Sequence, residues 1–206
     1  MAALVAGSIR PANVQVDTLG INVSENTKHK AVLLYDTEQS EVQLFKNVTN
    51  LIKRAKQTDK PDEFKAFCLT GMSRKERLHA IVQSMDRYYY QYDGIQLVVI
   101  DGIADLVRCA NDEAESVAII DELYRLAGIY KTCIICVLHF IPNGLKLRGH
   151  LGSELQRKAA AILSIEKDED PAMSVVKALK VRDGSPLDVP LMLFSWDKAA
   201  GMHLYR

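Results

Sequence analysis

Short apolar runs alternate along the chain with segments in which apolar residues recur every three or four positions. The runs at 31–35, 97–100 and 133–138 contain no polar residue, and 64–69 forms a fourth apolar segment. Runs of this kind are typical of strands covered by helices on both faces. The periodic segments lie at 41–56, 73–90 and 112–127. Strands that alternate with helices in this way predict a parallel sheet with right-handed crossovers.

Local signals mark where these helices begin and end. Ser40 is followed by Gln43, and Ser73 by Glu76. Each pair has the spacing of a capping box, in which side chains and backbone amides exchange hydrogen bonds at the first turn of a helix. Gly128 is a stop signal for the helix that starts near residue 112.

The two ends of the chain depart from the alternation. Met1–Gly7 resembles the middle or end of a helix, and residues 8–30 a loop or a weak hairpin. After a loop at 140–150 and a short helix at 153–160 come four strands joined by turns, at 161–166, 174–182, 189–196 and 202–205. The expected fold class is therefore α/β, a largely parallel sheet flanked by helices with a C-terminal antiparallel meander, in one domain of residues 1–206.

Composition bears on whether the protein binds nucleic acid, contacts a membrane or is secreted. The chain has 206 residues, of which 26 are basic and 26 acidic, so a nucleic-acid contact would need a local basic patch. No apolar run approaches the roughly 18 residues of a membrane span, and the start lacks a signal peptide. We expect a cytoplasmic protein without membrane contact.

Cys133 and Cys136 form a C-x-x-C on a strand, where their side chains would point to opposite faces. The cysteines are therefore interpreted as buried apolar fillers.

Polar side chains follow three of the predicted strands at their carboxyl ends, namely Glu38, Asp101 and His139. Ligands of open α/β sheets bind beyond these ends, and a carboxylate there can hold magnesium, usually through water. A second carboxylate can deprotonate a water, and a polar group can sense a cleaved phosphate. Taken alone, each has a plainer interpretation: a turn cap for Asp101, a helix N-terminal charge for Glu38 and an ordinary strand-end residue for His139.

Two cations lie near the end of the chain. Lys180 and Arg182 are two positions apart on a predicted strand, so they project from the same face. Such a pair suits contact with a phosphate on a neighbouring molecule, and the alternative is a solvated strand face.

Five short motifs stand in a fixed order, D-T-E-Q-S at 36–40, L-V-V-I-D at 97–101, V-L-H at 137–139, R-G-H-L-G-S-E-L-Q at 148–156 and K-V-R-D-G at 180–184. The set resembles the RecA-like ATPase core, which it covers from residue 31 to 206. Within this group the set resembles plasmid RepA-type and DnaB-type hexameric helicases, together with RecA-family ATPases described as mobilization proteins of Bacteroides-like mobile elements.

The resemblance implies a motor ATPase that uses ATP and Mg²⁺ and acts on DNA in replication or mobilization. Asp101 would be the magnesium-holding aspartate, Glu38 the catalytic glutamate and His139 the sensor. Lys180 and Arg182 would be the finger pair acting on the adjacent subunit's nucleotide in a ring, such as a homo-hexamer. The loop at 140–152 would touch single-stranded DNA, with the candidates Lys146, Arg148 and His150. Mobilization or replication proteins would be further partners.

The family's phosphate loop, G-x-x-x-x-G-K-[ST], does not occur in the sequence. The nearest pattern, Gly144–His150, lacks its lysine and hydroxyl residue and follows the sensor strand. Either the chain starts inside a longer active ATPase, with Met1–Gly7 in the helix after that loop, or it is a natural derivative that does not bind ATP. Without the strand that carries the loop, we expect a break in the sheet before the tail and lowered thermal stability.

Two rivals to a helicase-like motor remain open. One is a non-catalytic DNA- or protein-binding assembly module with the same fold. The other is a recombination ATPase that forms filaments, which the shape of its particles would distinguish from a ring.

Overall fold

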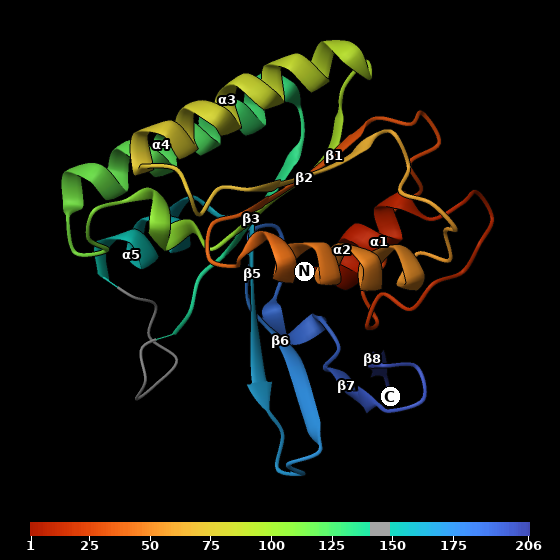
Figure 1. Cartoon of the computed structure of the whole chain (residues 1–206). Helices are drawn as coiled ribbons and strands as arrows, with labels where there is room; N and C mark the ends of the chain where they lie inside the picture. Colours follow the sequence, from red (N-terminus) through yellow and green to blue (C-terminus); the bar gives the residue numbers. More distant parts are fainter. Residues whose placement is uncertain (141–148) are drawn as a thin grey trace.

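The computed structural model describes residues 1–140 and 149–206 and has a four-stranded parallel sheet at its centre (Figure 1). The strand order is β2-β1-β3-β4, formed by β1 (Ala31–Asp36), β2 (Phe64–Cys68), β3 (Ile95–Asp101) and β4 (Cys133–Val137). Asp36 pairs with Asp101, which in turn pairs with Val137. The carboxyl ends of three neighbouring strands therefore meet at one edge, and the predicted α/β class is confirmed.

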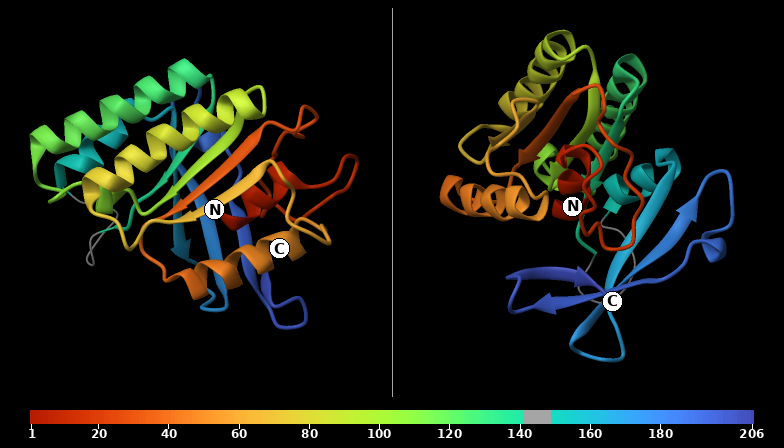
Figure 2. Two further views of the ribbon diagram at one scale, coloured as in Figure 1. Left: turned by 45° about the horizontal axis from the view of Figure 1, so that its top comes forward. Right: turned by 90° about the vertical axis from the view of Figure 1, so that its right-hand side faces the viewer.

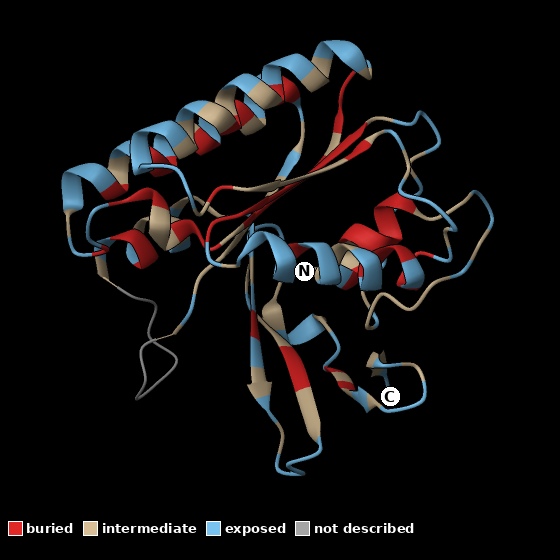
Figure 3. Cartoon of the chain, viewed as in Figure 1, coloured by how far each residue is buried: buried red, intermediate tan, exposed pale blue. Residues whose placement is uncertain are grey.

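Helices cover both faces of this sheet (Figure 2). One face carries α1 (Ala2–Ile9) and α2 (Glu41–Arg54), and the other carries α3 (Arg74–Gln91) and α4 (Glu113–Tyr130). The short helix α5 (Gly149–Lys158) lies beside α4. All six residues of β1 are buried between the two layers, as Figure 3 shows for the middle of the sheet. This burial explains why the strand sequence shows no polar alternation.

The predicted capping box is confirmed at Ser73 and Glu76, and at Ser40 only one of its two hydrogen bonds is present, because the Gln43 side chain donates to Asn47. Ser40 accepts the N–H of Gln43 at the start of α2. At the start of α3, Ser73 and Glu76 form both hydrogen bonds of the capping box.

Two helix boundaries differ from the prediction. α4 continues through Gly128 to Tyr130, because burial of the Tyr130 ring offsets the cost of about 1 kcal/mol for a glycine inside a helix. α5 begins at Gly149, four residues before the predicted start at Ser153. The fully buried Leu151 explains this early start, because its N–H donates to the Ala110 carbonyl and its side chain joins the core.

The C-terminal residues form the predicted antiparallel meander, in the order β5-β6-β7-β8. Its strands are β5 (Ala161–Lys167), β6 (Met173–Val181), β7 (Met192–Asp197) and β8 (Met202–Tyr205). The apolar centre of this sheet packs on Leu19 and Ile21, in the strand-free segment between α1 and β1. Among the described strands, β4 pairs with β3 and β5 with β6, so the expected break between the two sheets is present.

Arg54 fastens the meander to the parallel layer. Its Nη1 donates to the Asp17 carbonyl at 2.9 Å, and its Nη2 donates to the His203 carbonyl in β8. The arginine is 9% exposed, and burial lowers its pKa. The link therefore joins the end of α2 to both the N-terminal segment and the last strand.

The interpretation of all cysteines as buried fillers is wrong for Cys109 and Cys133, which are exposed. Cys133 opens β4, which is an edge strand of the parallel sheet among the described residues. Cys136 fits the interpretation, since burial raises the pKa of its thiol to about 12.

In the part of the chain that the structure describes, no helix combines the length and apolar character that a membrane span needs.

Candidate functional site

The turn after β1 presents Glu38 at the carboxyl edge of the parallel sheet. Asp36 is 2% exposed, and its Oδ1 accepts the N–H of Glu38 at 3.0 Å and the N–H of Gln39 at 2.7 Å. An aspartate that accepts amides two and three residues ahead fixes the direction of a turn. Asp36 therefore determines where Glu38 leaves the sheet.

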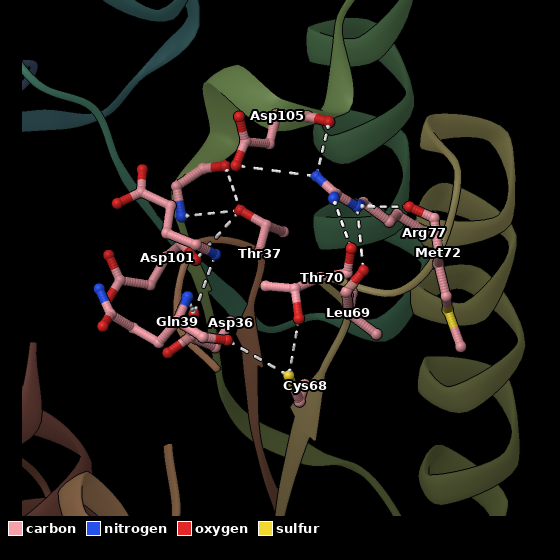
Figure 4. A network of polar contacts seen from close by, with 12 residues as sticks. Asp36, Thr37, Gln39, Cys68, Leu69, Thr70, Met72, Arg77, Asp101 and Asp105 are labelled. Atoms are coloured by element: carbon pink, nitrogen blue, oxygen red, sulfur yellow. Dashed lines mark hydrogen bonds and ion pairs between the residues drawn. The ribbon is translucent and has the colours of Figure 1, made fainter. Parts of the chain in front are cut away.

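Thr37 locks the ends of β1 and β3 together (Figure 4). Its N–H donates to the Asp101 carbonyl at 2.7 Å. Its hydroxyl donates to the Gly102 carbonyl at 2.8 Å and lies 3.2 Å from the Gly102 N–H, which donates to it. Because Thr37 is 2% exposed, these bonds have little competition from water. The two strand ends that carry Glu38 and Asp101 are thus held as one unit.

The Glu38 carboxylate lies over the residue that follows Asp101. A Cβ built on Gly102 would collide with this carboxylate, so the D-G sequence leaves room for Glu38. Glu38 Oε2 also lies 3.5 Å from His139 Nε2, beyond the end of β4. The side chains of Glu38 and His139 are 32% and 78% exposed, so a ligand can reach both. The structure therefore brings together the three strand-end residues that the sequence singled out.

We call Asp36, Glu38, Asp101 and His139 the carboxylate edge. Burial and the negative charges of Asp36 and Glu38 raise the pKa of Asp101, in that order of size. The positive charges of the Met1 amino group and His139 oppose this rise. The Met1 amino group precedes the first turn of α1, and burial lowers its pKa. The edge is therefore a place where negative charges repel one another, and a cation would relieve the repulsion.

The donor set fits a magnesium ion held mainly through water. Among residues 1–140 and 149–206, no three His, Cys, Asp or Glu side chains are arranged to hold a metal ion directly. Magnesium keeps several of its waters and is commonly bound through one or two carboxylates plus substrate phosphates. Asp101 is the carboxylate best suited to this, because Asp36 is engaged by two backbone amides and Glu38 by His139.

Lys180 and Arg182 lie away from the carboxylate edge, at the C-terminal end of α5. Lys180 Nζ donates to the Gln156 carbonyl at 2.5 Å, and Arg182 Nη2 donates to the Lys158 carbonyl at 2.9 Å. Both cations reach the same way, as predicted from their spacing. Within one chain they satisfy the last carbonyls of a helix, where a positive charge is favourable.

The three DNA candidates fall in two places. Lys146 and Arg148 lie outside the described residues. His150 is exposed in the first turn of α5. This turn is anchored to the segment after β3, because the next residue, Leu151, donates its N–H to the Ala110 carbonyl at 3.0 Å.

Two residues that build the site, Asp36 and Thr37, were not among the residues predicted from the sequence. The role of Asp36 could have been predicted from the sequence. An aspartate at the end of a strand commonly accepts the backbone N–H groups two and three residues ahead, in the turn that follows. The hydroxyl partner of Thr37 is Gly102, which directly follows β3 and is 65 positions away along the chain. Only the sheet register shows that contact.

Comparisons with known proteins do not name a family for this chain. The sequence matches no protein-family model, and no curated protein matches it either.

Proposed function

We propose that the carboxylate edge is the magnesium-dependent ATP-hydrolysis site of a RecA-like motor ATPase. Such a motor would act on single-stranded DNA as a ring, in replication or mobilization of a plasmid or transposon. The observation that carries the proposal is the meeting of Glu38, Asp101 and His139 at the ends of three adjacent parallel strands. Carboxylates at this edge of an α/β sheet are where ligands of the fold bind.

Each residue has a role that its surroundings support. Asp101 would hold a water of the magnesium ion, and the bound ion would neutralise charge on the phosphates. Glu38 is accessible and fixed by the Asp36 turn, so it is placed to accept a proton from an attacking water. His139, just beyond the end of β4, contacts the Glu38 carboxylate across the end of β3 and would act as the sensor of the cleaved phosphate. The sequence contains no phosphate loop, so no residue of this chain is assigned to the β- and γ-phosphates.

The proposal is tested by ATP binding and hydrolysis with Mg²⁺, on this chain and on one extended upstream through the next in-frame start. Glu38→Gln should lower hydrolysis by about 100-fold or more and leave ATP binding nearly unchanged. Asp101→Asn should weaken Mg²⁺-dependent ATP binding. Glu41→Gln, an exposed carboxylate at the start of α2, is the matched control. Hydrolysis by Glu38→Gln at the wild-type rate would contradict the assignment.

A non-catalytic assembly module is the second candidate, and the contacts of Lys180 and Arg182 with α5 favour it. In such a module these cations stabilise a helix end and have no role at a neighbour's nucleotide. Arg182→Ala separates the candidates. If Arg182→Ala loses hydrolysis but keeps ATP binding, Arg182 acts on the nucleotide of the adjacent subunit. If Arg182→Ala only lowers stability, and neither the 206-residue chain nor the extended chain binds ATP while both still assemble or hold DNA, the assembly module is supported.

A further inference from the structure

A cavity of about 430 Å³ lies between the start of α3 and the segment that runs from η1 (Ile103–Leu106) to α4. Three arginines line it, Arg74, Arg77 and Arg108, together with one carboxylate, Asp105. Glu38, Asp101 and His139 do not line it. Its volume is in the range of small-molecule sites. We call it the arginine cavity.

Arg77 is the fixed member of the three. Its Nε donates to the carbonyls of Leu69 and Met72, both at 3.0 Å, and its Nη2 donates to the Thr70 carbonyl at 3.3 Å (Figure 4). Its Nη1 lies 3.7 Å from Asp105 Oδ2, and its side chain is 14% exposed. Arg77 therefore holds the wall of the cavity in place and balances the charge of Asp105.

The other two arginines are available to a ligand. The side chain of Arg108 is 67% exposed and gives one N–H to Asp112 at 2.6 Å, which orients the guanidinium and leaves further donors. Arg74 is exposed, and its side chain makes no hydrogen bond or ion pair with residues 1–140 or 149–206. Arg77 is paired with Asp105, and Arg108 lies beside Asp112 and Glu115. Arg74 is thus the arginine of the cavity whose side chain has no acidic partner among the described residues.

The start of α3 adds donors at the same place. Ser73, which lines the cavity, is the N-cap of this 18-residue helix, and its hydroxyl accepts the N–H of Glu76. The Glu76 carboxylate accepts the Ser73 N–H at 2.7 Å, whereas the N–H groups of the first two helix positions, Arg74 and Lys75, have no partner inside the helix. Met72 and Val107 add a small apolar part to a lining that is mostly polar, which suits a small polar ligand.

We propose that the arginine cavity binds a small organic phosphate, with its phosphate between Arg74 and Arg108. Guanidinium groups suit phosphate because their planar donors bind two oxygens at once. The confined size of the cavity favours a small molecule over a nucleic-acid backbone, which needs an extended basic groove. This binding is independent of the function proposed for the carboxylate edge.

The first test is calorimetric titration of the 206-residue chain with pyrophosphate, and then with adenosine monophosphate, at low salt. Arg74→Ala and Arg108→Ala should each weaken binding about tenfold or more. Lys75→Ala is the matched control, because it removes the same charge one residue away and does not line the cavity. Binding of neither probe, or equal weakening by all three substitutions, would overturn the proposal. The proposal would also be overturned if a single-stranded oligonucleotide bound more tightly than either probe and if this binding were weakened by the same two arginine substitutions.

Cys109 provides a second readout that does not depend on a substitution. Its exposed thiol lines the cavity, whereas the exposed Cys133 lies on β4. Pyrophosphate should slow the reaction of Cys109 with a thiol reagent and leave Cys133 unaffected, as peptide mapping would show. Equal rates at Cys109 with and without pyrophosphate would contradict the site.

Discussion

The carboxylate edge and the arginine cavity are built on neighbouring strand-to-helix connections of one sheet, but opposite backbone groups hold them. At the carboxylate edge, amide N–H groups hold Asp36, and the hydroxyl of Thr37 joins two strand ends. At the arginine cavity, carbonyl groups hold Arg77. In each region a charged side chain with little exposure, Asp36 or Arg77, holds the backbone, and an exposed charge of the same sign stands at a fixed place. The comparison separates residues that build a site from residues that meet a ligand.

Arg77→Met tests the building role at the arginine cavity and should have the largest effect on stability. Three carbonyls of the loop after β2 would lose their partner, which should lower the free energy of unfolding by about 2–3 kcal/mol in urea denaturation. Arg74→Ala, one turn earlier on α3, removes an exposed charge and should change it by less than about 0.5 kcal/mol. Equal losses in the two variants would contradict the division of roles.

Thr37→Val tests the building role at the carboxylate edge. The substitution keeps the shape of the side chain but leaves the Gly102 N–H and carbonyl without their partner, at a cost of about 1–2 kcal/mol. Thr49→Val is the control, because its hydroxyl donates to the Phe45 carbonyl on the exposed side of α2. If both variants unfold at the same urea concentration, the hydroxyl of Thr37 does not lock the strands.

The pH dependence of the stability of Asp101→Asn tests the repulsion between Asp101 and the other carboxylates of the carboxylate edge. The pKa of Asp101 is raised in the folded protein, so its contribution to stability is fully present below the unfolded pKa and is lost as pH rises through the folded pKa. The stability of Asp101→Asn relative to wild type should therefore increase as pH rises from about 4 to 7. Urea denaturation at several pH values measures this, with exposed Asp59→Asn as the control. A difference that shrinks with rising pH would contradict the repulsion.

The comparison also shows what the sequence could predict. Glu38, Asp101 and His139 could be found because each follows an apolar run, and parallel strands bring their carboxyl ends to one edge. The capping residues Ser40 and Ser73 could be found because a helix start is decided within one turn. These features depend on neighbours in the chain or on the general geometry of parallel sheets.

The arginine cavity could not be predicted, because its residues come from a helix start and from the segment after another strand. Nothing in the spacing of Arg74 and Arg108 shows that they share a wall. The positions of Lys180 and Arg182 are a similar case. Their common direction follows from strand periodicity, but their partners are the last carbonyls of α5, which only tertiary structure brings to them.

The most direct test of the central claim is metal binding at the carboxylate edge. Mn²⁺ can replace Mg²⁺ at oxygen ligands, and its paramagnetic resonance signal reports free and bound ion. We expect one Mn²⁺ site in the wild-type chain near neutral pH, at least about tenfold weaker in Asp101→Asn and unchanged in Glu41→Gln. Binding of equal strength by wild type and Asp101→Asn would contradict the claim that this edge is a magnesium site.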